Sequence, residues 1–282
     1  MLRDHSDTEN LGEPSTRRSA SPISADDDFY GLDDLLPEPE SPLPAPYSFS
    51  TYEIPSDIDL TVEDEDNRGR QLVLRLVGSH PLWNTARIFT TFLLKNPGLV
   101  KDRSVLELGA GAALPSIACA IAGAKQVVIT DYPDTDLVEN MRFNVDTNVP
   151  GNLRSSVDVV GHLWGHDVKH LMARTEDKGY DTLILSDLHD ALIKTVNATT
   201  SPDGCVLVFF TSHRPHLVKE DNAFFPRLAE SDGGWVYEKV VEEWAGAMFE
   251  EDPGDEKVRG TVHGWKAWRV KDGQKAGEKA TS

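Results

Sequence analysis

The sequence predicts an α/β protein with a mostly parallel, Rossmann-like sheet that is closed by an antiparallel hairpin at its C-terminal end. Three observations carry this prediction. From residue 104 to residue 230, short β-rich apolar runs alternate with segments of helical spacing, which is typical of a parallel sheet with helices on both faces. An apolar run that contains Glu107 breaks into small residues at 109–111, as at a strand-to-helix turn. Two more β-runs then follow with no convincing helix between them.

The expected elements can be placed in order along the chain. A β-run at 71–77 is long enough for an edge strand or a hairpin, and helical spacing follows at 84–94. The alternating part has expected strands at 104–108, 126–130, 156–160, 181–186 and 204–210. Its expected helices span 113–122, 134–147, 167–174, 190–200 and 217–230. The last β-runs, 235–244 and 261–270, are interpreted as a hairpin whose loop lies at 249–255.

One folded domain is expected, at residues 48–271. Residues 1–47 form an acidic tail rich in Ser and Pro, and such a composition cannot bury enough apolar surface to offset the entropy of ordering. We therefore expect this tail to be disordered. Its apolar island at 29–36 is either a short docking motif or a segment without function. The polar residues 272–282 are expected to fray.

Composition limits the classes of partner. Asp and Glu number 47 against 28 Lys and Arg, which gives a formal net charge of -19, and residues 1–70 hold 18 of the acids but only 5 of the bases. An acidic protein repels phosphate backbones, so direct nucleic-acid binding would need a basic patch that the sequence does not show. A basic partner and simple solubility both remain as interpretations of the acidity.

The two cysteines and the apolar runs bear on the compartment. Cys119 and Cys205 lie in apolar runs, which predicts buried free thiols in a reducing compartment rather than a disulfide framework or a metal site. No apolar run has the length of a membrane span, and the N-terminus has no signal-peptide core. These features predict a cytosolic or nuclear protein that does not bind membranes.

The strongest functional motif is the turn at Gly109-Ala110-Gly111. Glycine lacks the Cβ atom that would hold a ligand away from the backbone. The next β-run, 126–131, ends in Asp131, and an acid at that position commonly accepts hydrogen bonds from a ribose diol. Together these residues predict an adenosine-containing cofactor. The alternative is a tight turn that binds nothing.

The identity of the cofactor follows from a missing glycine. A dinucleotide fingerprint has a third glycine that allows close packing of helix on strand, and Leu114 stands in that place here. A methyl-donor site has no pyrophosphate to bind, so it needs only the loop glycines and commonly carries an acid before them, as Glu107 is. The pattern favours S-adenosylmethionine over a dinucleotide.

Polar and aromatic residues after the expected strands are the other site candidates, since ligands of such sheets bind at the carboxyl ends of the strands. Asp131 is favoured as a ribose ligand because Asp134 is the more natural helix cap. Each of the others has a functional and a structural interpretation. Trp164 either stacks on adenine or covers the core, and Ser186 and Asp187 either lie at the transferred methyl group or cap the next helix. His213 and Arg214 either contact the substrate or form a turn. Judged alone, Trp83 is more often a core residue.

With these residues assembled, the chain resembles the fungal branch of a seven-strand methyltransferase family that is often labelled nicotinamide N-methyltransferase-like. The best-defined member class of that family methylates the N-terminal α-amine and an adjacent lysine of elongation factor 1-alpha. The stretches that carry the resemblance lie at 75–83, 105–116, 130–134, 184–188, 212–216 and 248–254.

The resemblance implies a cytoplasmic class I methyltransferase that uses S-adenosylmethionine. It also implies that the cofactor is contacted by Trp83, the loop at 109–111, Asp131, Trp164 and Ser186. The alternatives from other classes are a small-molecule methyltransferase and a catalytically weak cofactor-binding protein that acts through its tail.

The chain departs from the family pattern at two junctions. The family has a longer stretch with two tryptophans where Trp83 runs straight into Asn84, which leaves the entry helix short by about a turn. It also has an extra histidine-containing segment where Leu188 is followed directly by His189. Both missing segments are expected to flank the acceptor pocket.

Overall fold

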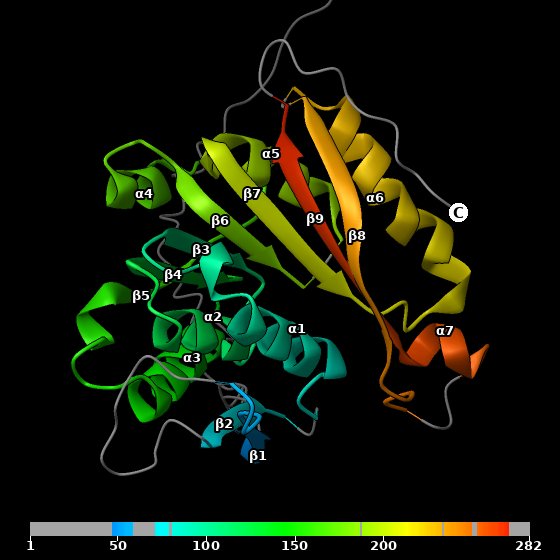
Figure 1. Ribbon diagram of the computed structural model, residues 1–282, viewed down its shortest axis with the longest axis horizontal. Coiled ribbons are helices and arrows are strands. Elements are labelled where there is room, and N and C mark those ends of the chain that lie inside the picture. The colour runs from blue at the N-terminus through cyan, green and yellow to red at the C-terminus, as the bar shows by residue number, and fades with distance from the viewer. Residues whose placement is uncertain are drawn as a thin grey trace, which may run out of the picture. The chain divides into compact units, whose positions relative to one another are not determined.

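The computed structural model describes residues 47–58, 71–78, 81–186, 188–232, 234–249 and 253–270. Within these residues a seven-stranded sheet has the order β5-β4-β3-β6-β7-β9-β8 (Figure 1). The strands are β3 (Ser104–Leu108), β4 (Gln126–Asp131), β5 (Val157–Gly161), β6 (Tyr180–Leu185), β7 (Thr200–Phe210), β8 (Trp235–Trp244) and β9 (Thr261–Arg269). The first five are parallel, and β9 runs antiparallel to both of its neighbours, β7 and β8. The predicted fold class is confirmed.

Helices cover both faces of this sheet. Successive side chains of a strand point to opposite faces, so the apolar strands present an apolar surface on each side that the helices bury. Val105 of β3 packs in a cluster with α1, α2 and α3, whereas Leu106 and Leu108 pack in a second cluster with α4, α5 and α6. The helices are α1 (Asn84–Lys95), α2 (Leu114–Ile121), α3 (Thr135–Asn148), α4 (Lys169–Met172), α5 (Asp190–Thr199), α6 (Val218–Glu230) and α7 (Glu256–Gly260). Full burial of each large apolar side chain contributes about 1.5–3 kcal/mol. Both faces therefore stabilise the sheet that supports the strand ends.

A separate hairpin of β1 (Tyr47–Glu53) and β2 (Gln71–Val77) docks on α3. Asparagine side chains of α3 take the place of a neighbouring strand. The amide of Asn148 bonds the backbone N–H and carbonyl of Val73, both at 2.8 Å, and Asn144 does the same with Arg75 at 2.7 and 2.9 Å. These hydrogen bonds hold β2 against α3, beside the main sheet.

Two local expectations need correction. The sequence showed no convincing helix between the last two strands, yet α7 lies there, and it begins at the cap Asp255, whose carboxylate accepts from the N–H groups of Lys257 and Val258. Five residues are too few to show helical periodicity. The helix expected at 167–174 spans only 169–172 and continues as a 3-10 turn at 173–175.

Cys119 and Cys205 are buried free thiols, as predicted. In the described part of the chain, no helix combines the length and apolarity needed to span a bilayer. Residues 1–46 of the expected tail, with its apolar island, and the terminal residues 271–282 lie outside the described residues. The last residue assigned to the tail, Tyr47, instead begins β1.

We expect removal of the tail to leave the folded domain stable. A truncation that starts at Pro46 should change the melting temperature by less than about 2 °C, because the composition of the tail offers little apolar surface to bury. A truncation that starts at Gln71 is the matched control, since it also removes Tyr52 and Ile54, which are 5% and 4% exposed. Differential scanning calorimetry should show a clear drop only for the second truncation. A large drop for the first would mean that the tail packs on the domain.

Candidate functional site

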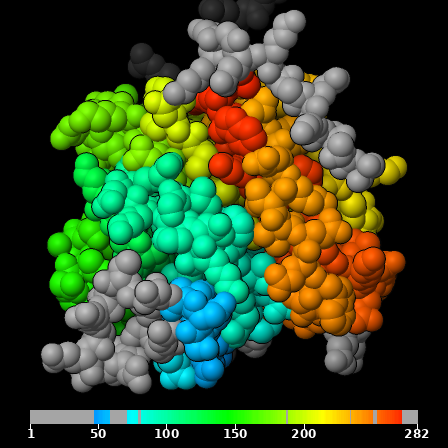
Figure 2. Space-filling model, viewed as in Figure 1, coloured from blue at the N-terminus to red at the C-terminus, as the bar shows by residue number. Residues whose placement is uncertain are grey.

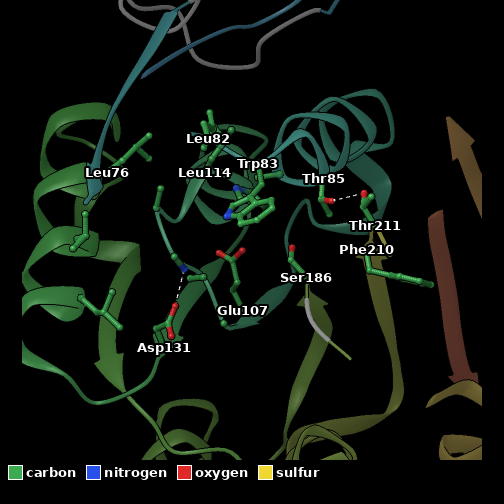
Figure 3. A pocket seen from close by; sticks show the side chains of 18 of the residues that line it. Leu76, Leu82, Trp83, Thr85, Glu107, Leu114, Asp131, Ser186, Phe210 and Thr211 are labelled. Atoms are coloured by element: carbon green, nitrogen blue, oxygen red, sulfur yellow. Dashed lines mark hydrogen bonds between the residues drawn. The ribbon is translucent and has the colours of Figure 1, made fainter. Parts of the chain in front are cut away.

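A cavity of about 580 Å³ lies at the carboxyl ends of the central strands. Its volume is in the range of small-molecule and cofactor sites. Most of the predicted site residues line this one cavity: Trp83, Glu107, Gly109, Ala110, Gly111, Asp131, Trp164, Ser186 and His213. Figure 3 labels Trp83, Glu107, Asp131 and Ser186 among them. Arg214 is exposed and does not line it, and Asp187 lies outside the described residues. The sequence therefore located the cavity, whereas the binding role of each residue stays a prediction.

The glycine turn has the backbone geometry that the motif suggested. Gly109 has a φ of +77° and Gly111 a φ of +54°, a region that residues with a side chain rarely adopt. A Cβ atom on Gly109 would lie 2.9 Å from Cζ2 of Trp164. The N–H groups of Gly109 and Ala110 both donate to the carbonyl of Thr130, at 3.0 Å each. Main-chain geometry therefore favours glycine at both positions, and the indole of Trp164 adds a steric requirement for glycine at Gly109.

The carboxylate of Asp131 is hydrogen-bonded to the same turn. Its Oδ2 atom accepts from the N–H of Gly111 at 2.7 Å, and its Oδ1 atom accepts from the N–H of Tyr132 at 2.6 Å. The helix cap is Asp134, which accepts from the N–H groups of Asp136 and Leu137 at 3.0 and 3.2 Å. The capping alternative for Asp131 is therefore excluded.

Glu107 is a buried carboxyl group at the cavity wall. Its side chain is only 2% exposed and points into the cavity (Figure 3). Burial raises the pKa of Glu107 to about 8, the Ser116 hydroxyl offsets part of this shift, and the charge of Asp131 adds to it. The Oε2 atom has no hydrogen-bond partner among the described residues. A buried carboxyl oxygen without a partner is costly, so this position suits a ligand that carries positive charge or donates a hydrogen bond.

Aromatic rings gather around Trp83 in the cavity wall. The indole of Trp83 contacts the rings of His213 and Phe249, at centroid distances of 4.6 and 5.9 Å. Asn84 holds the segment after β8 in place, since its side-chain amide donates to the carbonyls of Ala245 and Gly246 at 3.2 Å each. Figure 2 shows the orange residues of β8 and this segment beside the residues of α1.

Sequence reasoning missed several polar residues of the wall: Thr85, Asn140, Thr211 and Asp221. Thr85 and Thr211 are joined through their hydroxyls at 3.0 Å. Asp221 lies in the first turn of α6 and accepts from the Ser212 hydroxyl at 2.7 Å. Acids are common in the first turn of any helix because they complement its dipole. Nothing in the sequence therefore set Asp221 apart.

Comparison with known proteins decides the family. A family model described as "Lysine methyltransferase" matches residues 71–231. This chain belongs to that family. A relative from Cryptococcus neoformans var. neoformans serotype D, "Protein N-terminal and lysine N-methyltransferase EFM7", is 55% identical over 90% of this chain and 93% of its own. A protein of the same name from Schizosaccharomyces pombe is 41% identical over 86% of this chain and 97% of its own.

Solved structures agree with the fold. A structure described as an S-adenosylmethionine-dependent methyltransferase from Streptococcus mutans has a TM-score of 0.50 and 14% identity, and it covers 69% of this chain and 53% of its own. At this identity the likeness shows the fold alone. The family and its N-methyltransferase relatives make this chain a methyltransferase, and its cofactor is S-adenosylmethionine, as the sequence predicted. The Oε2 atom of Glu107, which has no hydrogen-bond partner among the described residues, fits that cofactor, which carries a sulfonium and an ammonium group.

We expect Asp131→Ala to weaken cofactor binding by roughly 1.5–3 kcal/mol, as for the loss of a charged hydrogen bond. The variant loses both the carboxylate and the tether of Gly111. Titration calorimetry with S-adenosylhomocysteine measures the effect. Asp134→Ala is the matched control, since it removes a helix cap and should cost about 1 kcal/mol of stability without changing the Kd. An unchanged Kd in Asp131→Ala would remove Asp131 from the site.

Proposed function

We propose that the enzyme methylates the N-terminal α-amine and an adjacent lysine of elongation factor 1-alpha in the cytoplasm. The observation that carries this proposal is one cavity that is lined by the acids Glu107 and Asp131 and by the ring pair Trp83 and His213. The acids suit a cationic adenosine cofactor, and the ring pair suits an amine. The names of the relatives support a protein amine as the acceptor, and the motif resemblance supports elongation factor 1-alpha.

The residues divide between the parts of the cofactor. Asp131 is placed to accept hydrogen bonds from a ribose diol, and the 109–111 turn allows close approach of the backbone. Trp164 offers an aromatic surface to adenine, Glu107 compensates positive charge, and Ser186 lies at the end of β6 near the centre of the cavity. None of these assignments requires a metal ion.

When bound, the cofactor supplies a methyl group on a sulfonium: the amine lone pair forms the N–C bond, the C–S bonding pair stays on sulfur, and the proton lost beforehand by the ammonium goes to water. The protein's part is to hold the amine in line and to exclude water. Burial in the cavity lowers the pKa of an ammonium group and so favours the neutral nucleophile. An α-amine, with an ordinary pKa near 8, needs a smaller shift than a lysine near 10.4.

The test is incubation of the purified full-length protein with labelled S-adenosylmethionine and a lysate from cells that lack this enzyme. We expect one labelled protein band at the size of elongation factor 1-alpha. Label confined to low-mass compounds would contradict the proposal and indicate a small-molecule methyltransferase. Absence of transferred label, with cofactor binding intact, would instead indicate a binding protein without turnover on these substrates.

A further inference from the structure

We propose that Asp221, together with the Trp83–His213 ring pair, forms the subsite that receives the acceptor amine. The assignment rests on the proposed function and adds a residue that neither motif nor resemblance identified. Asp221 lines the same cavity as Glu107 and Asp131, but it comes from α6, which follows β7.

The position of Asp221 separates it from the cofactor end. Asp131 ends β4, and the strand order β4-β3-β6-β7 places three strand spacings between that end and β7. At about 4.8 Å per spacing, the two ends of the cavity are roughly 14 Å apart. A cofactor that contacts Asp131, Glu107 and, as the motif resemblance implies, one side of Trp83 leaves the β7 end, with Asp221 and His213, to a second molecule.

The carboxylate of Asp221 is fixed in direction. Its Oδ2 atom accepts from the Ser212 hydroxyl at 2.7 Å, and Ser212 itself is only 4% exposed. A carboxylate held in this way can accept a hydrogen bond from an amine N–H and so orient the lone pair. As the nitrogen takes a methyl group it gains positive charge, which the carboxylate stabilises.

The ring pair suits an amine that loses N–H groups as it is methylated. A methylated ammonium has fewer hydrogen-bond donors, and an aromatic face attracts it through cation–π contact, for which Trp is the best partner. Trp83 is 38% exposed, so part of its surface is open to a ligand. Its other contact, Phe249, is held by the buried Arg259, which donates to the Phe249 carbonyl at 2.6 Å. The indole is therefore positioned before any substrate arrives.

The first test compares Asp221→Asn with Glu220→Gln. Asn keeps the shape of Asp and can still accept from Ser212, whereas Glu220 is an exposed acid of the same helical turn that does not line the cavity. The acceptor is a peptide with a free α-amine and lysine at its second position. We expect kcat/KM for Asp221→Asn to fall roughly 10- to 100-fold, as for a lost charged hydrogen bond, with the Kd for S-adenosylhomocysteine changed less than about 2-fold. Glu220→Gln should match wild type in both.

The second test needs no turnover. The same peptide and its α-N-trimethylated form are titrated into protein saturated with S-adenosylhomocysteine. Wild type should bind both peptides, and Asp221→Asn should bind both more weakly. This result upholds the subsite even if no methyl group is transferred. In that case only the proposed function fails. The subsite is overturned if wild type binds neither peptide, if Asp221→Asn binds and reacts like wild type, or if Glu220→Gln loses as much. Asp221→Ser replaces Asp221→Asn should the latter not fold.

Discussion

Glu107→Gln is expected to remove much of the pH dependence of the stability of the cofactor-free protein. The ordinary pKa of a glutamate is 4.5, and burial raises that of Glu107 to about 8 in the folded state. Between these values the folded protein keeps a proton that the unfolded chain has lost. The stability contribution of this carboxyl is therefore fully present below pH 4.5 and is lost as the pH rises toward 8. The loss is at most about 1.4 kcal/mol per pH unit, in total on the order of 5 kcal/mol.

Urea unfolding at pH 5 and pH 8 measures this effect. The free energy of unfolding of Glu107→Gln should exceed that of wild type by a margin that grows with pH. Glu243→Gln, at an exposed acid of β8, is the matched control and should follow the wild-type pH profile. A cationic cofactor favours the ionised carboxylate, so its binding to wild type at pH 7 should release protons and its binding to Glu107→Gln should not. Identical pH slopes for wild type and Glu107→Gln would mean that the carboxyl is not held protonated.

Restoring the two missing family segments is expected to raise methyl transfer by up to about 100-fold, because a small misplacement of reacting groups can cost that much in rate. Both junctions adjoin the cavity: Trp83 and Leu188 line it, and each is followed by the start of a helix, α1 and α5 respectively. The Kd for the cofactor should change little, since its main predicted contacts, Asp131 and the glycine turn, follow β4 and β3 rather than either junction. Transfer rates on the acceptor peptide and calorimetry of the cofactor give the two quantities.

The control is an insertion of the same lengths at Gly151, in a turn where a side chain would meet no atom within 4 Å. That insertion should leave activity unchanged. Equal activity before and after restoration at Trp83 and Leu188 would show that the shortened junctions are harmless.

Much of the fold and the position of the cavity could be predicted because they depend on local patterns. Alternation of apolar runs indicated the parallel strands, and the competition between Asp131 and Asp134 for the helix cap was settled by position in the sequence. The asparagines of α3 that pair with β2 could not be predicted, since they act across some 70 residues and look like ordinary polar helix residues.

The same limit applies to the acceptor end. Asp221 lines the cavity because α6 packs beside the end of β7. The pKa of Glu107 is high because α2 buries its carboxyl group. Neither property depends on a sequence motif. The glycine turn, by contrast, is encoded where it acts, because positive φ angles and the nearby indole both select glycine.

The most direct test of the central claim is peptide mass spectrometry of purified, unmethylated elongation factor 1-alpha after incubation with this enzyme and S-adenosylmethionine. We predict methyl groups on the N-terminal α-amine and the adjacent lysine, with little or none when Asp131→Ala replaces wild type. The account would be contradicted if the N-terminal peptide stayed unmodified although wild type binds the cofactor, and if restoring the two junctions did not change this result.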